Sequence, residues 1–335
     1  MRSVTSVALR ILFIGGTGTI STSVSELALR RGHELAIVTR GSTPVPDSMQ
    51  GVEILRGDAG DPASLAAAIG DRDFDVVVNF RAFLPEQVAA DIELFRGRTG
   101  QYVFISSASA YQKPVERLPI TESTPLRNPF WQYSRDKIAA EDLLVEAYRA
   151  SGFPMTIVRP SHTYTHHSVP IFGRWTAIER MRAGKPVVVQ GDGTSLWHLT
   201  HSRDFAVAFV GLLGNRRAIG EAFHITGDEA LTWNQIFQIL ARAAGAPDPQ
   251  LVRVSSDAIA RSYPDEGPGL VGDKAHSVMF DNSKVKSLVP EFVATTPYWQ
   301  GAAEMIAWHD ADPSRGGIDP EQDAMLDALI AKYGA

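Results

Sequence analysis

One tyrosine and one lysine in the middle of the chain are spaced so that they could move a proton together. Tyr133 and Lys137 stand four positions apart, which places both side chains on one face of a helix. An ammonium held beside a phenol stabilises the phenolate and lowers the pKa of the tyrosine from about 10. The spacing predicts that Tyr133 exchanges a proton with a substrate near neutral pH; the alternative is an ordinary packed residue of an amphipathic helix.

Serine hydroxyls stand upstream of this pair, where a short apolar run ends. Ser107 follows the strand-like run 102–105, and Ser109 lies two residues further along. A hydroxyl at the carboxyl end of a strand can hold the oxygen of a substrate. We expect Ser107 to orient the reacting oxygen, with Ser109 close to the substrate.

A glycine-rich turn joins the first apolar run, 11–14, to a helical segment. Gly15 permits a tight turn, and Gly18 lets the backbone approach a pyrophosphate, which binds the free N–H groups and positive dipole end of a helix. Ser21 replaces the third glycine of the usual pattern and is small enough for close packing. The residues expected to bind a dinucleotide here are Gly15, Thr17, Gly18, Thr19 and Ile20.

The end of the second strand-like run indicates which dinucleotide binds. An acidic residue there would bind the ribose 2′-hydroxyl of NAD and repel a 2′-phosphate. This chain has Thr39-Arg40-Gly41 instead, and a guanidinium attracts a 2′-phosphate. The sequence therefore favours NADP over NAD, unless Arg40 is a solvated loop charge. Asp58, after the third run, contacts the adenine or simply stabilises a turn.

Alternating apolar runs and helical segments must position these residues. Nearly continuous apolar runs separated by helices predict an α/β fold with a doubly wound parallel sheet of the Rossmann type over residues 10–160. The expected strands are 11–14, 35–38, 52–55, 74–78, 102–105 and 155–158, and the expected helices are 21–31, 65–69, 85–95 and 131–148.

The pattern becomes irregular after Pro160. Short strands and helices alternate with loops rich in proline and glycine, such as 261–274. We expect a smaller C-terminal substrate-binding region, formed by 161–200 and 227–335, over the carboxyl edge of the sheet, where ligands of open α/β sheets bind. Segment 202–226 is expected to return to the first domain.

Composition limits the classes of function. The chain has 335 residues, of which 44% are hydrophobic and 21% charged, and its formal net charge is −6. This argues against a nucleic-acid partner, which usually requires a basic face. The absence of cysteine excludes disulfides and thiolate sites and fits a cytoplasmic protein. We also expect no signal peptide, no transmembrane helix and no membrane partner.

Histidines and tryptophans in the irregular half offer further candidates. The spacings of His162, His166, His167, His198 and His201 match no strong metal template, so we expect no metal site. His162 and His198 are candidates for substrate contacts as neutral hydrogen-bonding groups. Trp197 either packs in the core or stacks on the substrate.

Together these features resemble a known superfamily. The glycine loop, the serine-rich strand end, the Tyr133/Lys137 pair and Arg159-Pro160 are similar to those of the extended short-chain dehydrogenases/reductases, in the NAD-dependent epimerase/dehydratase branch. The resemblance implies a Ser–Tyr–Lys mechanism. Tyr133 would move the hydroxyl proton, Lys137 would also bind the nicotinamide ribose, and Asn79 would border the cofactor.

The resemblance also implies substrates and assembly. Family members commonly act on nucleotide sugars as epimerases, dehydratases or reductases, and dimerise through two long helices, here 85–96 and 131–150. Ala108-Ser109 stands where the dehydratases carry Asp-Glu, which argues against dehydration, and His162 and the altered segment 195–201 weaken the case for a nucleotide sugar. Three arginines remain available for a diphosphate, namely Arg174, Arg180 and Arg182.

The sequence supports two functions of different classes, an enzyme and a non-catalytic binding protein. The first is an NAD(P)-dependent oxidoreductase or epimerase that acts on the alcohol or carbonyl of a sugar-like, small-molecule substrate. The alternative is a non-catalytic NADP-sensing or RNA-associated member of the superfamily. Retention of Ser107, Tyr133 and Lys137 favours chemistry, because a sensor has no need of all three.

Overall fold

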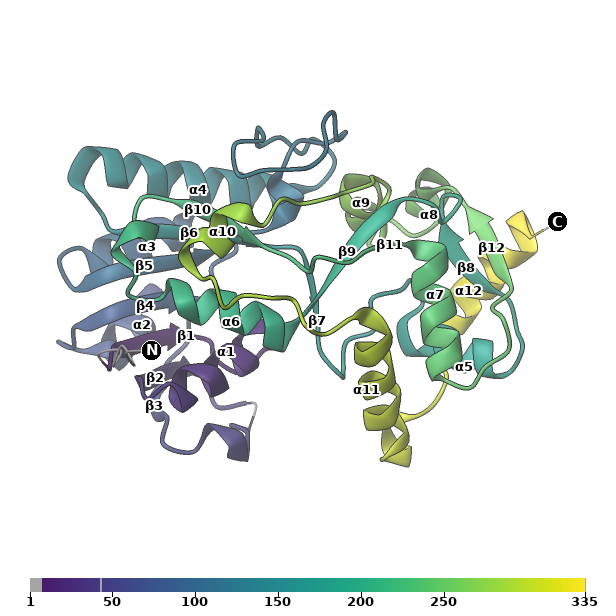
Figure 1. Ribbon diagram of the computed structural model, residues 1–335, viewed down its shortest axis with the longest axis horizontal. Coiled ribbons are helices and arrows are strands. Elements are labelled where there is room, and N and C mark those ends of the chain that lie inside the picture. Colours follow the sequence, from purple (N-terminus) through teal and green to yellow (C-terminus); the bar gives the residue numbers. More distant parts are fainter. Residues whose placement is uncertain (1–7, 43, 335) are drawn as a thin grey trace.

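The protein is described by a computed structural model that covers residues 8–42 and 44–334 and has two lobes (Figure 1). The last residue of the expected C-terminal region, Ala335, lies outside the described residues. The N-terminal lobe, built on one large sheet, holds the first half of the chain. The C-terminal lobe contains two small sheets and the helices around them, and the chain ends there (Figure 1).

A seven-stranded parallel sheet with the order β10-β6-β5-β4-β1-β2-β3 forms the N-terminal lobe. The predicted doubly wound parallel sheet is confirmed. Its strands are β1 Arg10–Ile14, β2 Glu34–Thr39, β3 Glu53–Arg56, β4 Phe74–Asn79, β5 Thr99–Ile105, β6 Met155–Pro160 and β10 Ala222–Ile225. Its helices are α1 Thr19–Arg30, α2 Pro62–Ile69, α3 Pro85–Phe95, α4 Gln132–Ser151, α6 Ser202–Leu212 and α10 Ser283–Leu288.

Each central strand serves two hydrophobic cores, because successive side chains of a strand point to opposite faces. In β1, Ile11 and Phe13 enter the core under α1, α6 and α10. Leu12 and Ile14 enter the core under α2, α3 and α4. This double burial explains why the strands appear in the sequence as unbroken apolar runs.

Shorter elements make the C-terminal lobe. One three-stranded sheet joins β7 His162–Tyr164, β9 Leu196–His201 and β11 Ala230–Thr232, and a two-stranded sheet joins β8 Val187–Gln190 and β12 Leu251–Val254. The helices are α5 Arg174–Arg182, α7 Trp233–Ala243, α8 Ser256–Ser262, α9 Gly267–Gly269, the π-helical turn Leu270–Lys274, α11 Tyr298–Asp310 and α12 Pro320–Tyr333.

The segment 261–274, expected as an irregular loop, is largely helical. Ser255 caps α8 by accepting a hydrogen bond from the backbone N–H of Ala258. Ile259 and Leu270 then enter a small core against α12. The sequence expectation was wrong here because the helical pieces are too short to show a period, and tertiary packing stabilises them.

No helix among the described residues combines the length and apolarity needed to cross a membrane.

Candidate active site

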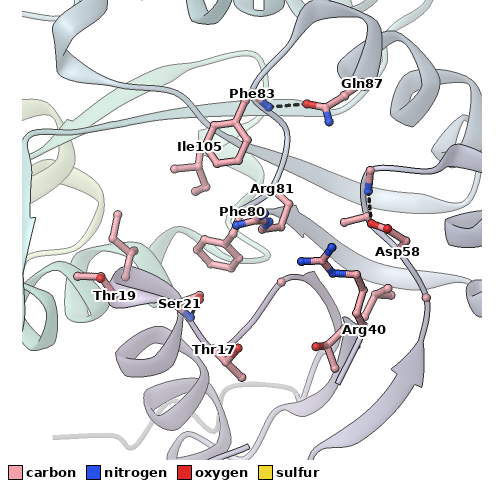
Figure 2. A pocket seen from close by; sticks show the side chains of 18 of the residues that line it. Thr17, Thr19, Ser21, Arg40, Asp58, Phe80, Arg81, Phe83, Gln87 and Ile105 are labelled. Atoms are coloured by element: carbon pink, nitrogen blue, oxygen red, sulfur yellow. Dashed lines mark hydrogen bonds between the residues drawn. The ribbon is translucent and has the colours of Figure 1, made fainter. Parts of the chain in front are cut away.

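The larger cavity, of about 800 Å³, opens at the carboxyl ends of the parallel strands (Figure 2). It lies where the chain, having built β2 and β3 on one side of β1, continues with β4 on the other side. Open α/β sheets bind ligands at this reversal of strand order. Of the predicted site residues, those that line it are Gly15, Thr17, Gly18, Thr19, Ile20, Arg40, Asp58, Tyr133 and Lys137.

The glycine turn at the base of this cavity has the expected conformation. Gly15 has φ +80°, in the left-handed region that favours glycine. The backbone N–H of Gly18 donates to Ser21 Oγ at 2.8 Å, so the serine in the third glycine position also holds the turn. A Cβ on Gly15 would come within 2.6 Å of Arg81 Cγ, because the Arg81 side chain lies across this turn.

Arginine side chains give this cavity a positive character. Arg40 extends into it from the end of β2, and Arg81 enters from the loop after β4 (Figure 2). The Arg56 guanidinium lies against Gly41, next to Arg40. Within the described part of the chain, none of these three forms an ion pair, so their charges are free to meet an anionic ligand.

Asp58 borders the cavity and also holds a turn. Its Oδ1 accepts a hydrogen bond from the backbone N–H of Gly60 at 2.9 Å (Figure 2). Its own N–H donates to Ser64 Oγ at 3.0 Å. Asp58 thus stabilises a turn, and its contact with the adenine stays a prediction.

Asn79 does not face the cavity, contrary to its expected position beside the cofactor. It is buried, and its Nδ2 donates to Asp91 Oδ2 at 2.6 Å. Its Oδ1 accepts from the backbone N–H of Arg81 at 2.7 Å, so it fixes the turn that presents Arg81. Burial raises the pKa of Asp91 to about 6.

Tyr133 lies between the larger cavity and a second, smaller one, and it lines both. Lys137 follows it on α4 with its Nζ 5.6 Å from the centroid of the Tyr133 ring. The lysine Nζ donates to the carbonyl oxygens of Ala82 at 2.6 Å and Ile105 at 2.7 Å. Both side chains therefore belong to the site, as the spacing predicted, and the lysine is anchored to the backbone.

The charge states of this pair differ from the expectation. Burial raises the pKa of Tyr133, and the hydrogen bond from Ser107 only partly opposes this effect. Burial also lowers the pKa of Lys137 to about 7. The pKa of Tyr133 is therefore raised and not lowered as predicted, because burial disfavours the charged phenolate. With its pKa raised, the Tyr133 hydroxyl is protonated at neutral pH and has a proton to donate.

The second cavity, of about 220 Å³, adjoins the first at Tyr133 and Pro160. Ser107, Ser109, His162 and Trp197 line it. Ser109 Oγ lies 2.8 Å from both Ser107 Oγ and Ser134 Oγ, which forms a chain of hydroxyls that leads to the cavity. Burial lowers the pKa of His162 to about 3, so its imidazole is neutral.

His198 lies behind this cavity and does not line it. Its Nδ1 is hydrogen-bonded to the carbonyl of Gly227 at 2.7 Å, and its ring meets Phe280 edge to face. The expected substrate contact of His198 is therefore not observed; the side chain supports Phe280. Among the described residues, no group of three or more histidines and carboxylates could hold a metal ion.

Sequence reasoning missed several lining residues. In the larger cavity these include Phe80, Arg81, Phe83 and Gln87, and in the second they include Asp273, Lys274 and Phe280. The sequence contained an indication for Arg81, because a large residue stands there in place of the small residues that usually follow the fourth strand. It contained none for Asp273 and Lys274, since only the tertiary fold brings the short helical turn 270–274 to the site.

Two family models match overlapping parts of the chain. Residues 88–226 match the NAD dependent epimerase/dehydratase family, and residues 8–107 match the NmrA-like family. Among solved structures, dTDP-glucose 4,6-dehydratase from Bacillus anthracis in complex with NAD superposes with a TM-score of 0.74 at 19% identity and covers 92% of this chain and 98% of that one. UDP-glucose 4-epimerase from Bifidobacterium longum in complex with NAD⁺ and UDP gives 0.73 at 20% identity, over 91% and 99%. These likenesses establish the fold.

Curated relatives have differing activities. A chloroplast stem-loop binding protein of 41 kDa from Arabidopsis thaliana is 29% identical over 72% of this chain and 65% of its own length. The 2′-dehydrokanamycin reductase of Streptomyces kanamyceticus is 26% identical over 71% of this chain and 68% of its own length. The chain thus spans about two thirds of the length of these relatives.

Proposed function

Because this chain belongs to the extended short-chain dehydrogenase/reductase superfamily, in its NAD-dependent epimerase/dehydratase branch, we propose that it is an NADP-dependent oxidoreductase or epimerase. It acts on an alcohol or carbonyl group of a sugar-like substrate. The observation that carries this proposal is the position of Tyr133, which borders both the large cavity and the small one. A proton donor in that position can serve a substrate in the small cavity while a dinucleotide fills the large one.

The residues of the larger cavity fit a dinucleotide phosphate. The left-handed turn at Gly15 and the open N-terminus of α1 leave backbone N–H groups for a pyrophosphate. Arg81 lies over the same turn and adds a positive charge to it. Arg40, with Arg56 nearby, would bind a 2′-phosphate. When bound, the nicotinamide supplies or accepts the hydride.

The chain's own groups handle the proton. In the direction of carbonyl reduction, protonated Tyr133 donates its Oη proton to the substrate oxygen, and the hydroxyls of Ser107 and Ser109 orient that oxygen. Lys137 sits behind Tyr133, and its ammonium form would offset the negative charge that the tyrosine acquires. The neutral His162 offers a further hydrogen bond to the substrate.

A non-catalytic NADP-binding or RNA-associated protein is the second candidate, favoured by the chloroplast stem-loop binding relative. The formal net charge of −6 gives no support to RNA binding. Turnover distinguishes the two candidates.

The test is NADPH oxidation against a panel of sugar-derived ketones and aldehydes, with wild type and Tyr133→Phe. We expect the variant to lose about 10²- to 10⁴-fold in kcat, because the general acid is gone, while its affinity for NADPH stays within about twofold. Tyr148→Phe is the matched control, since Tyr148 lies exposed on the same helix. Equal turnover in Tyr133→Phe and wild type would contradict the assigned proton role.

A further inference from the structure

We infer that the second cavity takes a single polyhydroxylated ring, a free sugar or cyclitol, and not a sugar attached to a nucleotide diphosphate. This inference rests on the proposed function, since it names the substrate class for the same site. It differs from what the structural neighbours bind, because their bound ligands include UDP and UDP-glucose.

The two cavities differ in size. The larger cavity measures about 800 Å³ and is matched to a dinucleotide, whereas the second measures about 220 Å³. A nucleotide-linked sugar is only slightly smaller than a dinucleotide, because it also carries a nucleoside, a diphosphate and a sugar ring. A cavity with about a quarter of the volume matches one ring, and a nucleotide attached to that ring would have to lie outside it.

The three arginines that the sequence offered for a diphosphate all pair with carboxylates. Arg180 is buried and lies 2.5 Å from Asp323 and 2.7 Å from Asp327. Arg182 pairs with Asp310 at 2.7 Å, and Arg174 pairs with Glu266 at 3.6 Å. None of the three lines the cavity. Arg180 and Arg182 thus hold elements of the C-terminal lobe together, whereas Arg174 forms an exposed ion pair away from the cavity lining.

The lining of the second cavity contains one cationic side chain and one carboxylate. Lys274 is the only cation among the described residues that line the second cavity, and its neighbour in the chain, Asp273, is a carboxylate that lines it too. Lys113 lies fully buried behind Asp273, with its Nζ 3.8 Å from the Asp273 carboxylate. A diphosphate would meet this carboxylate with at most one accessible opposing charge, so the site disfavours it.

The same lining suits a sugar ring. Trp131, Trp197 and Phe280 give this lining an aromatic part, which suits the apolar C–H groups of a sugar ring. Ser107, the neutral His162 and the Asp273 carboxylate provide donors and acceptors for hydroxyl groups. Trp131 lies 4.9 Å, centroid to centroid, from Tyr133, so a ring stacked on it is adjacent to the proton donor.

The test is isothermal titration of the full chain, with and without saturating NADPH, because this distinguishes loss of ring binding from loss of cofactor binding. One arm uses glucose, glucosamine and myo-inositol; the other uses UDP and UDP-glucose. The variants are Asp273→Asn and its control Asp248→Asn, an exposed aspartate outside the cavity. Myo-inositol has no carbonyl group for NADPH to reduce, and the arm without NADPH measures the binding of the two aldoses without turnover, even if the proposed reaction is wrong.

We expect at least one single-ring compound to bind with a Kd below about 10 mM. Asp273→Asn should weaken this binding about tenfold, and Asp248→Asn should leave it unchanged. UDP-glucose should bind no more tightly than glucose. The inference is overturned if UDP-glucose binds about tenfold more tightly than glucose, if none of the single-ring compounds binds, or if Asp273→Asn has no effect.

Discussion

The two cavities that meet at Tyr133 are built in different ways. The larger one is formed by turns at the ends of adjacent parallel strands. The pairing of these strands therefore fixes the positions of its residues. The smaller one collects single side chains from separate segments, such as Trp197 on β9, Asp273 in the π-helical turn and Phe280 beyond it. Under the proposed function, cofactor recognition would depend on regular backbone geometry, and substrate recognition on how the C-terminal lobe packs.

We therefore expect substitutions in the two lobes to have different effects on stability. Changes to the buried polar groups of the N-terminal lobe should affect the whole protein. Changes in the C-terminal lobe should remain local and spare the cofactor cavity.

Loss of Glu141 should have the largest effect on stability. Glu141 on α4 is buried, pairs with Arg159 on β6 at 2.6 Å and accepts a hydrogen bond from Ser106. Glu141→Gln leaves the buried guanidinium without its counter-charge, which should lower the free energy of unfolding by about 3–5 kcal/mol. Urea denaturation measures this, with the exposed Glu146→Gln as control. A loss below about 1 kcal/mol would show that the pair contributes no more than a surface ion pair.

Arg180 provides the matching test in the C-terminal lobe. Its guanidinium holds α12 through Asp323 and Asp327 and also donates to the carbonyl of Pro186. Arg180→Met should cost about 1.5–3 kcal/mol, because the aspartates retain access to water. Hydrogen exchange should show that α12 loses protection while α1 keeps it, with NADPH affinity unchanged. Loss of protection in α1 as well would show that the two lobes unfold as one unit.

A third prediction concerns the pH dependence of stability. Burial lowers the pKa of Lys137 to about 7 in the folded chain, whereas an unfolded lysine titrates near its ordinary value of 10.5. Between these values the unfolded state binds more protons, so the contribution of Lys137 to stability increases as pH rises from 7. This group adds at most about 1.4 kcal/mol per pH unit.

Denaturation of the cofactor-free protein between pH 7 and 9 measures this contribution. Lys137→Met should reduce the rise in stability over that range. Part of the rise should remain, because burial also lowers the pKa of Lys113. An unchanged slope in Lys137→Met would mean that the Lys137 ammonium stays protonated throughout this range.

The same contrast explains how much the sequence could predict. Strand ends and helix spacing determine where a residue lies in the fold. The sequence could therefore predict the positions of the glycine turn, Arg40 and the Tyr133–Lys137 pair. The predicted position of Asn79 beside the cofactor was wrong, because the sequence cannot show that its side chain is hydrogen-bonded to Asp91 and not exposed to the cavity.

The small cavity was only partly readable. Ser107 and Ser109 follow a recognisable strand, but Asp273 reaches the site through a helical turn that the sequence presents as a loop. The charge state of Tyr133 was also beyond prediction, because burial, which decides it, is a property of the folded chain.

The proposed function requires that Arg40 selects NADP in a cavity that binds either dinucleotide through its glycine turn and Arg81. Fluorescence titration of NADPH and NADH against the cofactor-stripped protein, Arg40→Ala and Arg81→Ala tests it most directly, with the exposed Arg30→Ala as control. We predict preference for NADPH in the wild type, a loss of about tenfold or more for NADPH alone in Arg40→Ala, and similar losses for both cofactors in Arg81→Ala. Equal affinity of the wild type for the two cofactors, or an Arg40→Ala variant that keeps its preference for NADPH, would contradict the account.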